Sequence, residues 1–482
     1  MNFTEPAFLF IFLPALLAAY FLTPSRGKNL VLTLFSVLFY AVGEWQFLPW
    51  LLGSTALNYV VARGLVAWRG TRRVRPLLAF GIFSDLALLV AFKYAGFFTE
   101  NINQLLLAAH LSALPVPMLA LPLGISFFTF HKISYKIDVV RGVAEVRRNP
   151  LDLLLYIMLF PQLIAGPIVR YRDIAQELVR RTVTRADFAE GVRRFMMGLG
   201  KKMLIANTVG LAADQIFSIP GAELPTGVAW LGIVCYTVQI YFDFSGYSDM
   251  AIGLARMLGF HFLENFNFPY VSTSITEFWQ RWHISLSRWF RDYLYIPLGS
   301  NRASVARTYL NLVIVFFLCG LWHGAKWTFV VWGLFHGLIL VCERLGLKRL
   351  LAVLPRPLRH FYALSLILAG WVVFRAPSLD QATAFLRALV GRGASSEVHT
   401  VAIYLDHRVA VALAAGLLGS IPWLPRITAA LDRSRQLQRG HVLAALDGGL
   451  VLVGHVVLAG VFALSVFQVA SSTYNPFIYF RF

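Results

Sequence analysis

The sequence predicts an all-α protein that crosses a membrane many times, and three observations indicate this fold class. Of the 482 residues, 58% are hydrophobic and 14% are charged, whereas soluble domains average about 45–50% apolar and about 25% charged residues. The mean hydropathy of +0.66 means that lipid has to cover much of the apolar surface. The apolar stretches are also continuous over lengths near that of a membrane helix, which excludes the short alternating strands of a membrane β-barrel.

The apolar stretches form on the order of 11–13 membrane elements, some of which we expect to be broken or re-entrant. They lie at residues 7–22, 29–48, 50–68, 77–98, 114–131, 150–168, 187–216, 226–256, 308–321, 326–342, 359–375, 409–424 and 445–470. Because no internal repeat and no long linker separates them, we expect one transmembrane domain over residues 1–482. Its motifs concentrate in residues 121–343, and further helices occupy residues 359–472.

Basic residues indicate how these helices are oriented. The formal net charge of +19 is explained by cytoplasmic loops rich in Lys and Arg, so we expect no nucleic-acid partner. The segment 99–113 has no Lys or Arg and is predicted to face outward. The basic residues gather between apolar stretches, at Arg69, Arg72, Arg73 and Arg75, between Arg170 and Arg194, and at Lys201 and Lys202.

The first apolar stretch is predicted to be retained as a membrane helix. Residues 1–6 carry Glu5 and no Lys or Arg, so the positive region of a signal peptide is missing. Arg26 and Lys28 follow the stretch directly, which places the N-terminus outside the cytoplasm.

The chain has three cysteines, Cys235, Cys319 and Cys342, all in apolar surroundings. An odd number argues against a disulfide framework, and no pair has the spacing of metal ligands. We therefore expect small buried thiols and no metal site.

Polar residues interrupt the apolar sequence between residues 241 and 343, and ionisable residues within a membrane indicate a functional site or a water-filled cavity. The first cluster carries Asp243 and Asp249. Six residues turn a helix through about 600°, so these two carboxylates are expected on different faces. The simpler interpretation is that each carboxylate caps a break at Gly246 or pairs with an Arg elsewhere, and direct catalysis is the alternative.

The second cluster, residues 274–302, is predicted to be a helix at the membrane–water boundary. Glu277 with Arg281, and Arg288 with Asp292, stand four residues apart and can pair along this helix. Aromatic residues beside arginines are typical of an interfacial helix.

Three histidines lie in this helix or in the third cluster, residues 319–337. His283 lies within the boundary helix, where structural and catalytic roles are equally open. His323 stands next to Gly324 in a membrane-like segment, and glycine lets another backbone or a ligand approach closely. A buried imidazole stays neutral and can accept a proton, so His323 is a candidate base, with a structural role as the alternative. His336 would face another side of a continuous helix and is predicted to be structural.

Several catalytic motifs are missing from the chain. It has no G-x-S-x-G elbow, no Walker loop, no H-E-x-x-H and no dinucleotide fingerprint. A serine hydrolase, an ATPase and a zinc enzyme are therefore disfavoured. A membrane-embedded base without a protein nucleophile suits attack by a substrate hydroxyl on an activated acyl donor.

Several longer motifs stand out in the sequence. They are LPLGISFFTFHKISYKIDVVRG (121–142), FPQLIAGPIVRY (160–171), YFDFSGYSDMAIGLARMLGF (241–260), ENFNFPYVSTSITEFW (264–279), EFWQRWHISLSRWFRDYLYIPLGSNR (277–302), GLWHGAKWTFVVWGLFHG (320–337) and NPFIYF (475–480). In order and spacing they resemble the motifs of the membrane-bound O-acyltransferase superfamily, most closely its bacterial alginate O-acetylase branch. The resemblance runs from about residue 5 to the C-terminus and is weakest across residues 345–470.

The resemblance implies a fold and a mechanism. The family fold is a ring of membrane helices around a tunnel, in which a cytoplasmic acyl donor meets an outer acceptor near a histidine. The family's proposed catalytic base corresponds to His323, and a second histidine linked to activity corresponds to His283. Two departures weaken the case for alginate itself as the acceptor: Lys326 stands where an Asn is expected, and His131 where an acidic residue is expected.

We therefore expect an O-acetyltransferase of the bacterial inner membrane that moves an acetyl group to an extracytoplasmic polysaccharide such as alginate. Acetyl-CoA or a similar acyl thioester is the expected donor substrate, without a tightly bound cofactor. Periplasmic acetyl-transfer proteins and the polysaccharide are the expected partners. Trp322 and Trp327 are expected to shape the substrate tunnel and exclude water. Four charged residues beside it are expected to hold the helices, namely Asp243, Asp249, Arg281 and Arg288.

Three alternatives stay open. The acceptor could be another envelope polymer, including teichoic acid that receives D-alanine, although that branch is typically shorter. A proton-coupled transporter would use the intramembrane Asp and His residues as a proton relay, but it predicts internal repeats, which the sequence lacks. A non-catalytic membrane subunit would tolerate replacement of His323.

Overall fold

The structure is a computed structural model that describes residues 1–300, 304–423, 427, 441–471 and 474–475. Every regular element in these ranges is a helix, which confirms the predicted fold class. Apart from residue 475, the motif at residues 475–480 lies outside the described residues.

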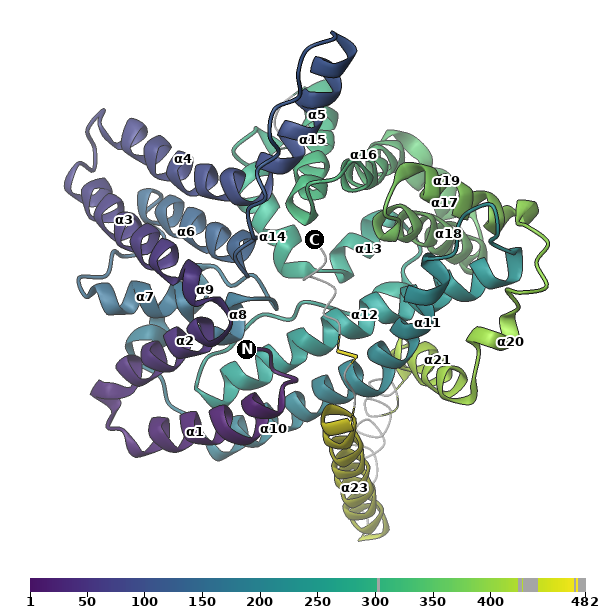
Figure 1. Cartoon of the computed structure of the whole chain (residues 1–482). Helices are drawn as coiled ribbons and strands as arrows, with labels where there is room; N and C mark the ends of the chain where they lie inside the picture. Colours follow the sequence, from purple (N-terminus) through teal and green to yellow (C-terminus); the bar gives the residue numbers. More distant parts are fainter. Residues whose placement is uncertain (301–303, 424–426, 428–440, 472–473, 476–482) are drawn as a thin grey trace.

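The helices fall into three consecutive groups along the chain (Figure 1). The N-terminal group comprises η1 Phe8–Phe12, α1 Leu13–Leu22, η2 Ser25–Gly27, α2 Lys28–Glu44, η3 Trp45–Phe47, α3 Leu48–Ala67, α4 Val74–Lys93, α5 Ala95–Ala108, α6 Ile125–Val140, α7 Pro150–Met158, α8 Phe160–Leu163 and α9 Tyr171–Val179. The middle group comprises α10 Arg185–Gly200, η4 Lys201–Ala206, α11 Asn207–Phe217, α12 Thr226–Met257, η5 Pro269–Val271, α13 Ile275–Arg281, α14 Ile284–Phe290 and η6 Arg291–Tyr295. The C-terminal group comprises α15 Val305–His323, α16 Trp327–Cys342, η8 Glu343–Leu347, α17 Lys348–Val353, α18 Arg356–Arg375, α19 Leu379–Arg387, η9 Ala388–Arg392, α20 Val401–Tyr404, α21 His407–Gly419 and α23 His441–Ser471.

By length and composition, the described part of the chain has 7 helical stretches that can cross a membrane. They are Ser25–Ala67, which contains both α2 and α3, then Val74–Lys93, Thr226–Met257, Val305–His323, Trp327–Val353, Arg356–Arg375 and Leu452–Ser471. Two shorter apolar helices, Phe8–Leu22 and His407–Gly419, add to these. The protein is therefore a multi-pass membrane protein, as the apolar stretches predicted.

The prediction for residues 99–131 is wrong in detail. The segment 99–113 lay outside the predicted membrane elements, but most of it belongs to helix α5. The stretch 114–131 was predicted to be one helix, but no regular structure forms before α6 begins at Ile125. Pro115, Pro117 and Pro122 explain the difference, because proline lacks the backbone donor that a helix needs and restricts the residue before it.

Helices α10 and α12 run side by side across the middle of the molecule (Figure 1). Glycines allow their backbones to touch: a Cβ added to Gly198 would lie 2.5 Å from the carbonyl oxygen of Gly246, and one added to Gly253 would lie 2.5 Å from that of Gly191. Small residues at regular spacing are the usual way for membrane helices to approach closely. This pair therefore forms a rigid centre on which the other helices pack.

Ion pairs lock the same two segments together. Asp243 of α12 binds Lys202 of η4, and both side chains are buried. Asp249 binds Arg194 at 2.7 Å and Lys201 at 2.6 Å. The sequence placed Lys201 and Lys202 among the basic residues that gather between apolar stretches. In the structure both lysines lie within a helical segment, η4. α12 continues through residue 246, so the carboxylates cap no break there. The other interpretation, pairing with an Arg elsewhere, holds for Asp249 with Arg194, whereas Asp243 pairs with a lysine.

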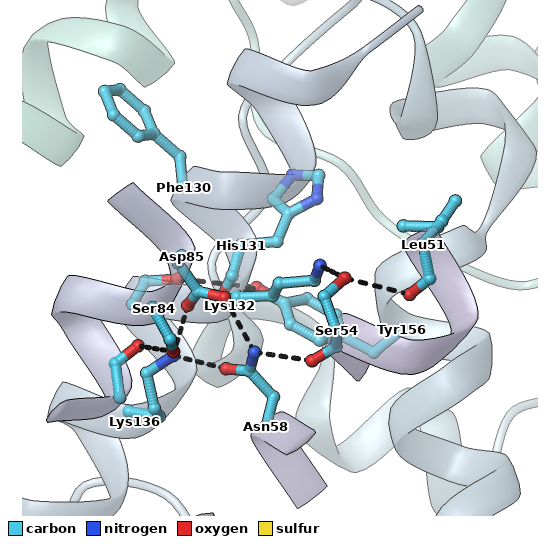
Figure 2. A network of polar contacts seen from close by, with 12 residues as sticks. Leu51, Ser54, Asn58, Ser84, Asp85, Phe130, His131, Lys132, Lys136 and Tyr156 are labelled. Carbon is cyan, nitrogen blue, oxygen red and sulfur yellow. Dashed lines mark hydrogen bonds and ion pairs between the residues drawn. The ribbon is translucent and has the colours of Figure 1, made fainter. Parts of the chain in front are cut away.

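A second buried polar network joins α3, α4 and α6 (Figure 2). Lys136 of α6 binds Asp85 of α4 and Asn58 of α3, and Asn58 also donates to Asp85 at 2.8 Å. Lys132, one turn before Lys136, donates to Ser54 at 2.5 Å. In hydrocarbon such groups are costly unless they are paired, so this network fixes how the three helices face one another.

The cysteine prediction is correct at two positions and wrong at the third. Cys235 and Cys319 are buried, whereas Cys342 is exposed at the end of α16. An exposed thiol among apolar residues of a membrane helix is compatible with contact to lipid, which the sequence alone does not distinguish from burial in protein.

The pair Asp85–Lys136 gives a test of the second network. Lys136→Met alone leaves the Asp85 carboxylate buried without its cation. Asp85→Leu alone leaves the Lys136 ammonium group buried without its anion. Each single change is expected to destabilise the protein by about 3–5 kcal/mol, and the double change is expected to recover most of that loss. Thermal unfolding in detergent measures both, and additive losses in the double variant would rule out a mutual pair.

Candidate active site

His323 is the last residue of α15, and the end of this helix is held by α4. The last four carbonyls of a helix lack partners within the helix, but here all four accept hydrogen bonds. The bonds run from Gly324 N to Gly320 O at 3.3 Å, from Tyr94 Oη to Leu321 O at 2.6 Å, and from Lys93 Nζ to Trp322 O at 2.6 Å and to His323 O at 3.4 Å. The position of His323 therefore depends on two consecutive residues at the end of α4.

The imidazole of His323 has a defined tautomer. Its Nδ1 lies 2.8 Å from the carbonyl oxygen of Cys319, and a carbonyl can only accept a hydrogen bond. In the neutral ring Nδ1 therefore carries the hydrogen, and Nε2 carries the lone pair that a general base uses. The side chain is buried.

Aromatic rings surround this imidazole. Ring centroids lie 4.9 Å away for Trp322, 5.0 Å for Trp332 of α16 and 5.4 Å for Phe374 of α18. Such surroundings exclude water from a reactive intermediate.

A cavity of ≈ 400 Å³ opens beside His323. It lies where several helix ends meet: α2 ends at Glu44, α4 ends at Lys93, and α6 begins at Ile125. The polar residues that line it are Asn2, Glu5, Glu44, Lys93, Ser126 and His323. The cavity is large enough for part of a substrate, and it gives His323 access to a polar group that enters from this end.

Glycines bring α15 and α16 together next to His323. An added Cβ on Gly320 would overlap the carbonyl oxygen of Phe329 and lie 3.2 Å from the Cα of Gly333. The two backbones therefore touch one turn before the histidine, as the glycines in the motif predicted. Trp332, next to Gly333, reaches the imidazole through this close approach.

His283 was predicted to lie within one helix, but in the structure it lies at a break between two helices. α13 ends at Arg281, α14 begins at Ile284, and His283 itself has φ 43° and ψ 54°, a left-handed conformation. Its side chain is fully buried, and its Nδ1 lies 3.1 Å from Asn265 Oδ1. The centroid of the Trp322 ring lies 6.1 Å from that of His283 and 4.9 Å from that of His323. The structure thus brings both predicted histidines to one indole.

Of the two tryptophans predicted to shape the tunnel, Trp322 and Trp327, only Trp322 lies at the cavity. Trp322 lines the cavity and contacts both histidines. Trp327 lies apart from His323 and is 54% exposed, and its indole donates to Asn101 of α5 at 2.9 Å. The difference arises because α5 packs over the start of α16, a contact that sequence spacing does not reveal.

Of the predicted charged residues, Arg281 pairs with Glu277 at 2.9 Å, as expected. The pair Arg288–Asp292 does not form: Arg288 is exposed, and Asp292 instead accepts from Arg170 at 2.6 Å and from Arg172. The helix widens to a π-helix at η6, which changes the spacing between positions four residues apart. Asp243 and Asp249 lie in the ion pairs between α12 and η4.

The remaining singled-out residues lie around the site without joining its chemistry. His336 is buried against Trp332 and Trp279, with ring centroids 5.1 Å and 5.4 Å away, a packing that suits its predicted structural role. Lys326 is exposed before α16, and His131 is buried in α6 beside Tyr156 (Figure 2).

Sequence reasoning missed Lys93, Tyr94, Asn265, Trp332 and Phe374. Lys93 could have been identified from the sequence, because a single lysine near the end of an apolar stretch indicates a function or a buried partner. Trp332 lies in the same motif as His323. Asn265 and Phe374 touch the histidines only through the tertiary fold, so no local pattern indicates them.

Comparison with known proteins gives consistent matches. Residues 86–379 match the model of the membrane-bound O-acyltransferase (MBOAT) family, a range that contains both histidines. The chain is 40% identical over 502 residues to the probable alginate O-acetylase of Azotobacter vinelandii, with 100% of both chains covered. It is 46% identical over 395 residues to that of Pseudomonas aeruginosa, covering 82% of this chain and 75% of the relative. It is 37% identical over 432 residues to the peptidoglycan O-acetyltransferase of Helicobacter pylori, covering 82% and 81%.

The contact between α15 and α16 can be tested at Gly320. Gly320→Ala places a methyl group against Phe329 and Gly333, so we expect a loss of about 1–3 kcal/mol in stability and a displaced His323. Gly454→Ala in α23, which has no atom within 4 Å of the added Cβ, is the control. Thermal unfolding of both variants in detergent is the measurement, and equal stability would show that the backbones are not in contact.

Proposed function

The chain belongs to the membrane-bound O-acyltransferase family and is an acyltransferase, and from this premise we propose that it O-acetylates a polysaccharide outside the cytoplasm. Two similar proteins are probable alginate O-acetylases, and a third is a peptidoglycan O-acetyltransferase. All three names describe acetyl transfer to a carbohydrate polymer. Because the polymers differ, the acceptor of this chain is proposed as a class, with alginate as one member.

The charge distribution supports a direction for the transfer. The cavity lies where α2 and α4 end, so the loop between α3 and α4 lies at the opposite end of these helices. That loop carries Arg69, Arg72 and Arg73, and the guanidinium group of Arg69 lies against Gly142, just after α6. Basic loops face the cytoplasm. The cavity beside His323 therefore opens on the outer side, where a polysaccharide hydroxyl arrives.

The opposite end suits an anionic acyl donor. Asp292 lies among arginines there, and Arg141 donates to its carbonyl oxygen at 3.1 Å. Arg141 and Arg291 are exposed, so their charges remain able to attract phosphates. Acetyl-CoA or a similar acyl thioester is the proposed donor substrate, and the chemistry calls for no tightly bound cofactor.

The observation that carries the mechanism is the Nδ1–H bond of His323 to Cys319, which leaves the lone pair on Nε2. Nε2 accepts the proton of the acceptor hydroxyl while that oxygen attacks the thioester carbonyl. The tetrahedral intermediate collapses, the carbon–sulfur bond breaks, and the thiolate takes the proton back from the imidazolium. An ester and a free thiol are the products, and the aromatic rings around His323 protect the thioester from water.

Periplasmic proteins that complete transfer to the polymer are the proposed partners. The described segments on the proposed outer side are short, and they include α5 with the irregular segment that follows it. A polymer needs a larger surface than these provide. The bacterial inner membrane is the proposed location, since the donor is made in the cytoplasm and the acceptor lies outside it.

The role of His323 is tested in the native host with His323→Gln, which keeps the side-chain volume but lacks the imidazole base. We expect loss of ester-linked acetate on surface polysaccharide to below about 1% of wild type, in line with general-base contributions of about 10²–10⁴-fold. Acetate is released by mild alkali and quantified, and membrane levels of each variant are compared.

His336→Gln serves as the matched control, because His336 is also buried among aromatic rings. We expect its acetate to follow the amount of protein in the membrane. Wild-type acetate in the His323 variant would refute the mechanism and favour a structural subunit.

The proposed orientation is tested by cysteine labelling in a Cys342→Ser background. Arg72→Cys should react with a membrane-impermeant maleimide only after the inner membrane is opened, whereas Ser112→Cys, in the irregular segment after α5, should react in spheroplasts without that step. The reverse pattern would place the cavity on the cytoplasmic side.

A further inference from the structure

We infer that Asn265 is a positioning residue of the acyltransfer site, which fixes the tautomer of His283 and so turns His283 Nε2 into a hydrogen-bond acceptor for the substrate. The inference rests on the proposed function, because the substrate group it serves is the hydroxyl or amide N–H of a reactant in acyl transfer.

The orientation of the Asn265 amide is determined by its neighbours. The backbone N–H of Ser285, which can only donate, lies 3.2 Å from Oδ1. The Ser285 hydroxyl accepts from the backbone N–H of Ile168 at 2.9 Å and lies 2.8 Å from the same Oδ1. On the other side, Nδ2 donates to the Ser248 hydroxyl at 3.1 Å. The oxygen of the amide therefore faces His283.

The tautomer of His283 follows from that orientation. Oδ1 only accepts hydrogen bonds, and it lies 3.1 Å from His283 Nδ1. Nδ1 therefore carries the hydrogen, and in the neutral ring the lone pair lies on Nε2. This nitrogen is buried and has no hydrogen-bond partner among the described residues. A buried acceptor without a partner is costly, and the His283 ring lies beside the indole of Trp322, which lines the cavity.

The backbone of His283 adds a second, independent sign of function. Its φ of 43° and ψ of 54° lie in the left-handed region, which a side chain with a Cβ rarely adopts. Strain of this kind persists where surrounding contacts enforce it, commonly at active sites. Asn265 supplies one of these contacts, because its own carbonyl oxygen accepts from the backbone N–H of Ile284 at 2.9 Å.

The position of His283 in the site indicates what its Nε2 acceptor binds. Its ring contacts Phe244 at 4.6 Å between centroids and shares the indole of Trp322 with His323. His323 also carries its lone pair on Nε2. His323 takes the proton in the proposed reaction, and His283 Nε2 holds a reactant N–H or O–H beside it. Asn265 acts only through His283.

The test measures acetyl transfer from acetyl-CoA to a soluble polysaccharide fragment by the purified protein in nanodiscs, with a periplasmic extract of the native host added to supply the proposed partner proteins. Asn265→Leu removes the acceptor oxygen at similar volume, and Asn265→Asp keeps it. His283→Asn keeps a donor for Asn265 and tolerates the left-handed backbone, but it lacks Nε2. Asn267→Leu, on the same segment with an exposed side chain, is the control. Thermal unfolding establishes that each variant is folded.

We expect Asn265→Leu and His283→Asn each to lower kcat/KM by about 10- to 100-fold, with the same division between kcat and KM. Asn265→Asp and Asn267→Leu should stay within about threefold of wild type, and Asn265→Leu should add no further loss in the His283→Asn protein.

Additive losses, or an Asn265→Asp protein that is folded and as inactive as Asn265→Leu, would overturn the inference. If Asn265→Leu does not fold, the Asp variant and His283→Asn decide, since an inactive Asp variant or a fully active His283→Asn contradicts it. Absence of transfer in wild type, with these variants folded, would instead refute the proposed function.

Discussion

A polar group inside a membrane needs a partner, and this requirement organises the molecule. Water is absent from the hydrocarbon region, so each buried charge has to find its counterpart on another helix. Lys202 with Asp243 joins η4 to α12, and Lys136 with Asp85 joins α6 to α4. These pairs join segments distant in the sequence, and they hold helices whose apolar surfaces alone would allow sliding against lipid or against one another.

The same requirement places His323, the proposed base. The end of α15 would leave open carbonyls in an apolar region, and Lys93 and Tyr94 satisfy those at residues 321–323. The cap and the glycine contact with α16 fix the backbone of His323, and the bond to Cys319 fixes its ring. These contacts suit general-base chemistry, because proton transfer depends on short, well-aligned contacts.

Much of this could be predicted from the sequence. Hydropathy predicted the helical class and most of the long helices, and the motif around His323 predicted the residue that the structure places beside the cavity. The errors came from tertiary effects: prolines shortened the helix expected at residues 114–131, and the break at His283 depends on Asn265, which is 18 positions away along the chain. Arg288 does not pair with Asp292, because Asp292 instead pairs with Arg170 and Arg172 at the start of α9. Trp327 turned toward α5, whose helix the sequence did not predict.

The central claim is that an acetyl group passes from a donor on one side of the membrane, through the site at His323, to an acceptor on the other. Sealed proteoliposomes with radiolabelled acetyl-CoA inside, and a soluble polysaccharide fragment with a periplasmic extract of the native host outside, test it directly. The account predicts alkali-labile label on the outer fragment from molecules whose basic loops face the lumen, and none from His323→Gln. Equal labelling by the variant, or labelling only when donor and acceptor share one side, would contradict it.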